Sequence, residues 1–303
     1  MKRHLFVASA ISLLMITGTF LTSCNVLFTT RDAGVVTTKY FDLKDFNAIE
    51  VGDGIIVDIS ASDTYEIDIN TNENILKNVT VVKDGKTLKI GHKWQGMIGF
   101  SNNTIEAKIT MPELTGLTIA NGTKGTIRGF KSNKDTDITI ADGSHIDLDM
   151  ETGNFTAKIA NGSYLNARLK STKTDIILSS GSSLFTDANT GDFNIKSSDS
   201  SRTSGNLQAT STTIRIGNSS SIELGGSGND LILTATDGSS AKLENFTIGN
   251  ANIHLSDASY ANMDINGQLT LSLHDGSKLV YGGNPILGDK MDIADGSKFE
   301  RRK

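Results

Sequence analysis

The chain has 303 residues, a formal net charge of −5 and a hydrophobic content of 37%, enough for a substantial core. It contains 30 glycines but only 2 prolines and 6% aromatic residues, which indicates many short strands and turns rather than helices. Apolar residues recur at regular intervals, which argues against a disordered Ser/Thr-rich stalk, and the absence of a Lys or Arg stripe argues against nucleic acid as a partner.

Residues 1–23 have the features of an export signal. Basic residues at positions 2–4 precede the apolar stretch Leu5–Phe20, which is too short to span a bilayer comfortably. The segment ends in Leu21-Thr22-Ser23-Cys24, which resembles the lipobox of bacterial lipoproteins. The resemblance implies cleavage before Cys24 and attachment of diacylglyceryl and palmitate-type N-acyl chains to it. The alternatives are an ordinary signal peptide with an incidental cysteine and an uncleaved membrane anchor.

Cys24 is the only cysteine, so an internal disulfide is excluded. Each buried methylene group adds about 0.8 kcal/mol to membrane binding, so several acyl chains anchor a protein far more firmly than one. We therefore expect the membrane to be a partner through lipidated Cys24. Residues 24–39 show no strong periodicity and are expected to form a short tether.

Residues 40–113 are predicted to form an irregular, β-rich cap over the open end of the repeats that follow. A helical turn is expected at Asn72–Lys77, with Thr71 or Asn72 as its N-cap. Val51-Gly52-Asp53-Gly54 is a degenerate version of a turn that recurs later in the chain. The expected strands of this segment are Phe46–Val51, Ile55–Ser60, Tyr65–Asn70, Val79–Lys83, Thr87–Gly91 and Thr104–Met111.

A four-residue motif, here called the tetrad, recurs through residues 114–303. Each copy has a small residue, then Asp, Asn or Ser, then usually Gly, and then Ser or Thr. Successive copies begin 18–21 residues apart, and so narrow a spread is typical of a solenoid. The copies begin at Ala120, Ala141, Ala160, Ser179, Ser198, Gly217, Thr236, Ser256, His274 and Ala294.

Apolar and polar residues alternate on both sides of each tetrad, as in Ile138 and Ile140 before one copy and Ile146 and Leu148 after it. Residues two apart lie on one face of a strand, so each repeat supplies at least two short strands with one face turned inward. Because like residue types recur once per period, we predict an all-β, right-handed parallel β-helix of about ten 19–20-residue coils. An antiparallel meander is the alternative, since Asn-Gly and Asp-Gly are also hairpin signals.

The third tetrad position, usually glycine, suits a left-handed backbone conformation at a sharp corner. Ser200, Ser219 and Ala258 occupy it in three copies, so we expect those corners to be strained or differently shaped.

The second tetrad position is predicted to form a row of side chains about 5 Å apart, here called the corner row. Four consecutive aspartates at its C-terminal end would repel one another, so calcium could bind there. Turn formation explains Asp at this position without any ligand, and no metal site is assigned. The predicted members are Asp142, Asn161, Ser180, Asp199, Asn218, Asp237, Asp257, Asp275 and Asp295.

Catalytic groups do not converge in the sequence. The 5 histidines lack the spacing of a metal site, and no tetrad serine differs from the others, so we assign no catalytic or cofactor residue and predict a non-enzyme. Trp94 lies in the glycine-rich segment Gly91–Phe100, which is the best candidate for a contact site outside the corner row. An apolar contact that closes the cap explains this tryptophan equally well.

Five segments carry a resemblance to a known family: Phe41–Val51, Thr71–Leu76, Asp84–Ile90, Ile109–Leu114 and Leu279–Pro285. They resemble the head GIN domain family of putative auto-transporter adhesins, a domain of unknown function common in Bacteroidetes lipoproteins, over about residues 40–299. The family usually has a Ser-Gly-Ala-Ser corner, and this chain favours Asp/Asn-Gly-Ser, which makes the corner edge more polar. The resemblance implies a β-helical fold and a surface or envelope role.

Together with the lipobox, the resemblance implies a non-enzymatic outer-membrane lipoprotein, periplasmic or surface-exposed, whose rod binds polysaccharide or protein ligands. The alternative is a polysaccharide-cleaving enzyme of the pectate-lyase type, because parallel β-helices also host such enzymes. We expect such an enzyme to have a groove with Asp, Arg or Lys pairs outside the corner row, and an adhesin to have none.

Overall fold

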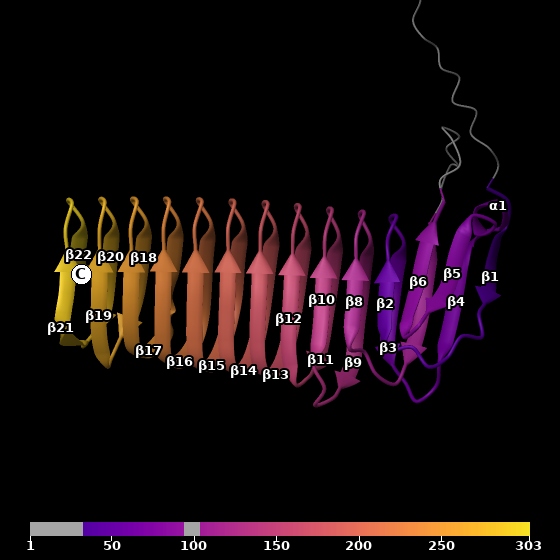
Figure 1. The fold of residues 1–303 in the computed structure, drawn as a ribbon, viewed down its shortest axis with the longest axis horizontal. Helices are drawn as coiled ribbons and strands as arrows, with labels where there is room; N and C mark the ends of the chain where they lie inside the picture. Colours follow the sequence, from indigo (N-terminus) through magenta and orange to yellow (C-terminus); the bar gives the residue numbers. More distant parts are fainter. Residues whose placement is uncertain (1–32, 94–103) are drawn as a thin grey trace, which may run out of the picture.

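The computed structural model describes residues 33–93 and 104–303, which wind into a β-solenoid of about 10 turns. Each coil places one strand in each of two facing parallel sheets, here called sheet A and sheet B (Figure 1). A sharp corner leads from sheet B to sheet A, and a looser bend leads back to sheet B. The predicted parallel β-helix is thus confirmed, and the antiparallel meander is wrong.

The two sheets are built from alternating stretches of the chain. In each coil of residues 164–255 a single long strand passes through the bend. Its first half lies in sheet A and its second half lies in sheet B. Sheet A contains β7 (Glu106–Met111), β3 (Ile56–Ala61), β9 (Lys124–Lys131), β11 (His145–Glu151), the first halves of β13 (Tyr164–Leu178), β14 (Ser183–Ser197), β15 (Arg202–Ile216), β16 (Ser221–Ala235) and β17 (Ser240–Leu255), then β18 (Tyr260–Ile265), β20 (Lys278–Gly283) and β22 (Lys298–Arg301). Sheet B contains β6 (Thr87–His92), β2 (Ala48–Val51), β8 (Gly116–Ile119), β10 (Thr136–Ile140), β12 (Asn154–Ile159), the second halves of β13 to β17, β19 (Gln268–Leu273) and β21 (Ile286–Ile293).

Residues one coil apart lie directly over each other. In sheet A, His145 of β11 opposes Tyr164 of β13, and Tyr164 in turn opposes Ser183 of β14. In sheet B, Ile140 of β10 opposes Ile159 of β12. Parallel main-chain bonding therefore fixes the register, and each outer face of the rod carries rows of side chains about 4.8 Å apart.

Each tetrad forms a turn whose two central residues both have positive φ, such as Asp142 (56°) and Gly143 (70°). Left-handed geometry at both central positions is that of a type I′ turn, for which Asn-Gly and Asp-Gly are the preferred pairs. Hairpins use the same turn, but here the strands that it joins lie in different sheets and pair with neighbouring coils instead. The main-chain ladder continues through the corner, because the Gly143 N–H donates to the Asn161 carbonyl at 2.9 Å.

The three corners without glycine keep the same shape. Ser200, Ser219 and Ala258 have φ values of 61°, 60° and 57°, and their N–H groups donate to the next corner as the glycines do. These corners were expected to be either strained or differently shaped, and they are strained. The continuous ladder of corner hydrogen bonds on either side holds these residues in a conformation that side chains disfavour.

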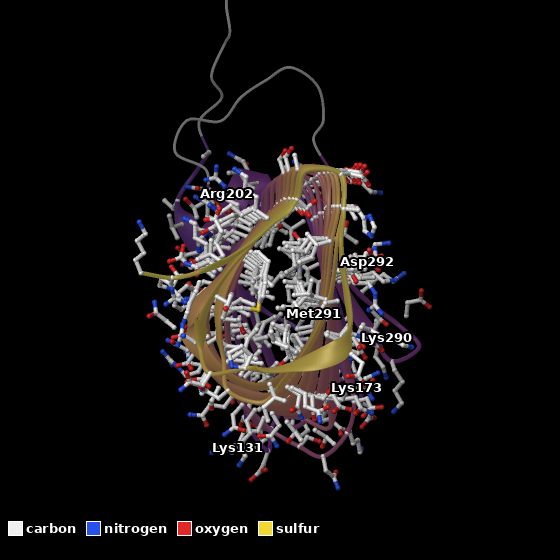
Figure 2. The ribbon with its side chains drawn as sticks, turned by 90° about the vertical axis from the view of Figure 1, so that its left-hand side faces the viewer. Lys131, Lys173, Arg202, Lys290, Met291 and Asp292 are labelled. Carbon is white, nitrogen blue, oxygen red and sulfur yellow. The ribbon has the colours of Figure 1, made fainter. Side chains whose placement is uncertain are left out.

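The core lies between the two sheets and runs along the rod, as the view along its axis shows (Figure 2). Alternate strand residues point inward and are buried, as in the burial pattern of β13, where Leu165 and Ile176 are core residues. The fourth tetrad residue also points inward, and Thr123 and Ser182 are fully buried.

The N-terminal segment combines a true coil with antiparallel strands that cover the end of the rod. β2 and β3 flank the degenerate corner, where Asp53 and Gly54 both have positive φ and the Gly54 N–H donates to the Asn121 carbonyl at 2.9 Å. The coil geometry thus begins before residue 114. β4 (Glu66–Asn72) pairs antiparallel with β7, and β5 (Val79–Asp84) pairs antiparallel with β6, while the helical turn α1 (Glu73–Leu76) lies where predicted.

One strand, β1 (Val36–Tyr40), starts inside the segment expected to be a tether. It pairs antiparallel with β4, and Ala33 just before it is buried. The sequence did not reveal this strand because it lies at an edge and is mostly exposed, so it has no inward-facing apolar alternation. Any tether from Cys24 is therefore shorter than residues 24–39.

We predict that exchanging glycine and alanine at two neighbouring corners has opposite effects on stability. A Cβ at Gly238 would meet nothing within 4 Å, so Gly238→Ala adds backbone strain without a clash. The entropy that the unfolded chain loses offsets part of this strain, so the substitution should lower the free energy of unfolding by about 0.5 kcal/mol. Ala258→Gly should raise it by about 0.5 kcal/mol, because relief of strain exceeds the entropy that glycine adds to the unfolded chain. Urea unfolding would measure both values, and a loss of stability in Ala258→Gly would contradict the strain.

Candidate functional site

The rod has two long edges, one formed by the corners and the other by the bends, and each carries a candidate site. Figure 2 shows Arg202, which follows a corner, near one edge, and Lys131 and Lys173, which flank the bends, near the other. The first edge carries the corner row. The second edge contains a groove, whose lining residues are given below.

The corner row is brought together as predicted. Asn161 donates from Nδ2 to Asp142 Oδ1 at 2.7 Å, and Asn218 donates in the same way to Asp199 at 2.9 Å. An amide placed next to a carboxylate satisfies its oxygen and separates it from the next negative charge. The alternation of Asp and Asn in the first part of the row therefore stabilises a stack that carboxylates alone would destabilise.

Two of the four aspartates at the C-terminal end of the row bond to their own turns. Asp237 accepts a hydrogen bond from the Thr236 hydroxyl and Asp257 from the Ser256 hydroxyl, each at 2.7 Å. Within residues 33–93 and 104–303, no group of three or more His, Cys, Asp or Glu side chains is placed to hold a metal ion. The geometry thus agrees with turn formation as the reason for Asp here.

His274 lies at the corner edge between two aspartates of the last coil. Its Nε2 lies 3.1 Å from Asp292 and its Nδ1 lies 3.5 Å from Asp295, so it joins two parts of the last coil. Desolvation is the largest single influence and lowers the pKa of His274. The hydrogen bond to Asp295 and the charge and hydrogen bond of Asp292 together outweigh it, so the pKa is raised above the ordinary value.

The other histidines do not form a site. His92 is buried, and burial lowers its pKa, while the charge of Asp53 partly opposes that shift. His145 points outward beside Tyr164, and His254 comes within 6.5 Å of His274, measured between ring centroids. His254 opposes Ser272 one coil away on the outer face of sheet B. The serines at the fourth tetrad position, such as Ser182, are buried under the corners.

The groove follows the bend edge of the rod and consists of two adjoining hollows of about 560 and 480 Å³. Both hollows share Asn189 and Gln208, whose exposed amides make no hydrogen bond to other described residues. Free amides in a groove offer donors and acceptors to a ligand. Further lining residues include Asp149, Arg168, Lys170, Asp187, Asn206, Thr210, Ser227 and Asn229.

The two cations that line the groove, Arg168 and Lys170, are paired with acids of the neighbouring coil. Arg168 lies 3.0 Å from Asp149, and Glu151 accepts from both Lys131 at 3.0 Å and Lys170 at 3.3 Å. The hydrogen bond from Lys131, followed by that from Lys170, lowers the pKa of Glu151. A groove with acidic and basic pairs was expected of the enzyme and not of an adhesin, so the groove meets the criterion stated for the enzyme. A carboxylate held in its charged form is nevertheless poorly suited to donate a proton.

The groove could have been found from one signal in the sequence. Asp149, Arg168, Asp187 and Asn206 occupy the same position in four successive repeats, and a polar residue at a fixed place in each repeat marks a polar row. Two of the predicted sites, Cys24 and Trp94 with most of its glycine-rich segment, lie outside the described residues.

Comparisons with known proteins agree with this geometry. A family model described as "Putative auto-transporter adhesin, head GIN domain" matches residues 45–185 and 173–285. A putative adhesin from Parabacteroides merdae has a crystal structure with a TM-score of 0.50 and 15% identity, over 90% of this chain and 98% of that one. At this identity the likeness shows the fold alone.

Two further solved structures come from Parabacteroides distasonis. A putative adhesin is 12% identical with a TM-score of 0.49, over 90% of this chain and 99% of that one. A putative lipid binding protein is 14% identical with a TM-score of 0.41, over 89% and 98%. No curated protein matches the sequence.

We predict that the last coil loosens as the pH rises. The pKa of His274 is higher in the folded chain than in the unfolded chain, so its contacts stabilise the coil fully below the ordinary histidine pKa of about 6.5. This contribution is lost as the pH rises through the raised folded value. Hydrogen-exchange protection factors of β21 and the last corner should therefore fall as the pH rises above about 6.5. In His274→Asn the fall should disappear, and an unchanged pH dependence would contradict the assignment.

Proposed function

The chain belongs to the head GIN domain family of putative auto-transporter adhesins, and from this membership we propose that it is a non-enzymatic cell-envelope lipoprotein whose β-solenoid binds a polysaccharide or protein ligand. The observation that carries the proposal is the groove along the bend edge. Its free amides at Asn189 and Gln208 lie one coil apart, so a ligand with repeating polar groups can contact several coils at once.

The lipidated form is proposed from the sequence. Cys24 ends an apolar segment of signal-peptide length, and several acyl chains on it would hold the protein at a membrane. No helix in residues 33–93 and 104–303 has the length and apolar character needed to cross a bilayer. We propose the outer membrane as the location, with the rod held away from the lipid by the segment before β1.

A polysaccharide-cleaving activity has two observations in its favour, the analogy with other parallel β-helices and the acidic and basic pairs in the groove. The groove carboxylates Asp149 and Glu151 are each bonded to a cation, which suits a scaffold role. Repeated ion pairs one coil apart hold neighbouring strands together along the groove wall. We therefore assign the groove to binding.

Replacing Cys24 should release the protein from the membrane. We expect wild-type chain to incorporate labelled palmitate and to sediment with the outer-membrane fraction, and Cys24→Ala to do neither, because the acylated thiol is absent. Ser23→Ala keeps a small residue before the cysteine and serves as the control. Membrane sedimentation of Cys24→Ala at the wild-type level would contradict the lipid anchor.

A glycan array and a panel of surface proteins would test the groove as the binding site. The fragment should start at residue 25, because a start at residue 39 would remove most of β1. We expect Asn189→Ala and Gln208→Ala each to weaken ligand binding by about fivefold, as for loss of one hydrogen bond of about 1 kcal/mol.

Asn252→Ala removes an exposed amide from sheet B and should leave affinity unchanged. Turnover of the bound polymer would overturn the non-enzymatic assignment. If Asn252→Ala lost as much affinity as Asn189→Ala and Gln208→Ala, the groove would not be the binding site.

A further inference from the structure

Three aromatic side chains lie on the outer face of sheet A in adjacent coils. His145 of β11 opposes Tyr164 of β13, and their ring centroids are 4.5 Å apart with 32° between the ring planes. Phe185 of β14 lies in the next coil, where it opposes Asn166, two residues along the strand from Tyr164. Strand spacing places the backbones of Tyr164 and Phe185 about 8 Å apart on one face. We call these three residues the aromatic platform.

Phe185 is an unusual residue for its position. Its strand alternates buried and exposed residues, and Phe185 falls on an exposed position with 40% of its surface accessible. Its neighbours on the same face are polar: Ser183 and Asp187 along its own strand, and Asn166 and Ser204 on the two adjacent strands. The ring therefore forms an apolar centre with a rim of hydrogen-bonding groups.

The aromatic platform adjoins the groove. Asp187, two residues beyond Phe185 on the same outer face, lines the groove, and so does Arg168, two residues beyond Asn166. A single ligand can therefore contact the aromatic rings and the groove amides together. The continuous surface runs across sheet A from the corner edge to the bend edge.

We propose that the aromatic platform binds the apolar face of a sugar ring in a neutral polysaccharide, whose hydroxyl groups contact the polar rim and the groove. This inference rests on the function proposed above and names its ligand class. A pyranose ring has a C–H face and an edge of hydroxyl groups, which matches aromatic rings surrounded by amide, hydroxyl and carboxylate groups. Aromatic side chains supply large apolar contact areas, and a tyrosine adds a hydroxyl group that can form a hydrogen bond at the wet edge of the contact.

Charge and size favour this ligand over two others. The groove cations Arg168 and Lys170 are already bonded to Asp149 and Glu151, so they are not free to neutralise a polyanion. A stable protein interface buries roughly 800 Å² on each partner around a packed apolar centre, which three partly exposed rings do not supply. A neutral polymer that contacts several coils needs neither free positive charge nor a broad apolar patch.

Affinity electrophoresis of the full chain in detergent would test this assignment. The gels would contain mannan, xyloglucan or laminarin as neutral polymers, and polygalacturonate or chondroitin sulfate as anionic ones. We expect at least one neutral polymer to retard the chain. Phe185→Ser and Tyr164→Ser should each weaken that binding by roughly three- to tenfold, the range expected for loss of one aromatic contact.

Ile177→Ser is the matched control, because Ile177 is 45% exposed on the outer face of sheet B and lies outside the groove. It should bind as the wild-type chain does, and circular dichroism would show that all three variants keep the fold. If neutral polymers retard Phe185→Ser and Tyr164→Ser as much as the wild-type chain, the aromatic platform is not the binding site, while the proposed function stands. Retardation by anionic polymers alone would lead to the same conclusion. Binding of neither polysaccharides nor surface proteins by the wild-type chain would overturn both proposals.

Discussion

The structure depends on one hydrogen bond that is repeated along an edge of the rod. In each corner the N–H of the third tetrad residue donates to the carbonyl of the second residue in the next coil, as from Gly162 to Ser180 at 2.9 Å. This bond needs left-handed geometry at two consecutive residues, which few sequences adopt without strain. The tetrad is conserved in type from coil to coil because each corner must present the same donor and acceptor to its neighbour.

A fixed register has consequences for the outer surface. In coils 164–235 each strand side chain faces the equivalent side chain of the next coil, so the composition of each row decides whether the row stabilises or destabilises the rod. Asp147 and Asn166 bond at 2.8 Å, and Asp175 and Asn194 bond at 2.9 Å, both one coil apart. The acid–amide and acid–base pairs thus prevent like charges from stacking along the rod. The fixed register also places Tyr164 and Phe185 on one face.

The sequence predicted the features that repeat locally. The period of the tetrads, the alternation around them and the positive φ of Gly143 all follow from short-range patterns, and the structure confirms them. It could not reveal β1, whose mostly exposed side chains lack alternation. The groove was also missed: the polar position that Asp149, Arg168 and Asp187 share indicates a polar row, but the hollow is recognised only once the coils are stacked. The aromatic platform was missed for a related reason, since His145, Tyr164 and Phe185 occupy two different positions of the repeat.

The path of the chain at the N-terminal end affects the order in which the protein folds. β2 pairs with β6 on one side and with β8 on the other, so Ile49 opposes both Leu88 and Leu117, whereas later coils pair residues 19 apart, such as Leu165 and Leu184. Closing a longer loop costs more chain entropy, so the early strands form their pairs more slowly than the later coils. Nucleation is therefore favoured in the later coils. β2 is synthesised first but completes its pairing only after β6 and β8 have left the ribosome.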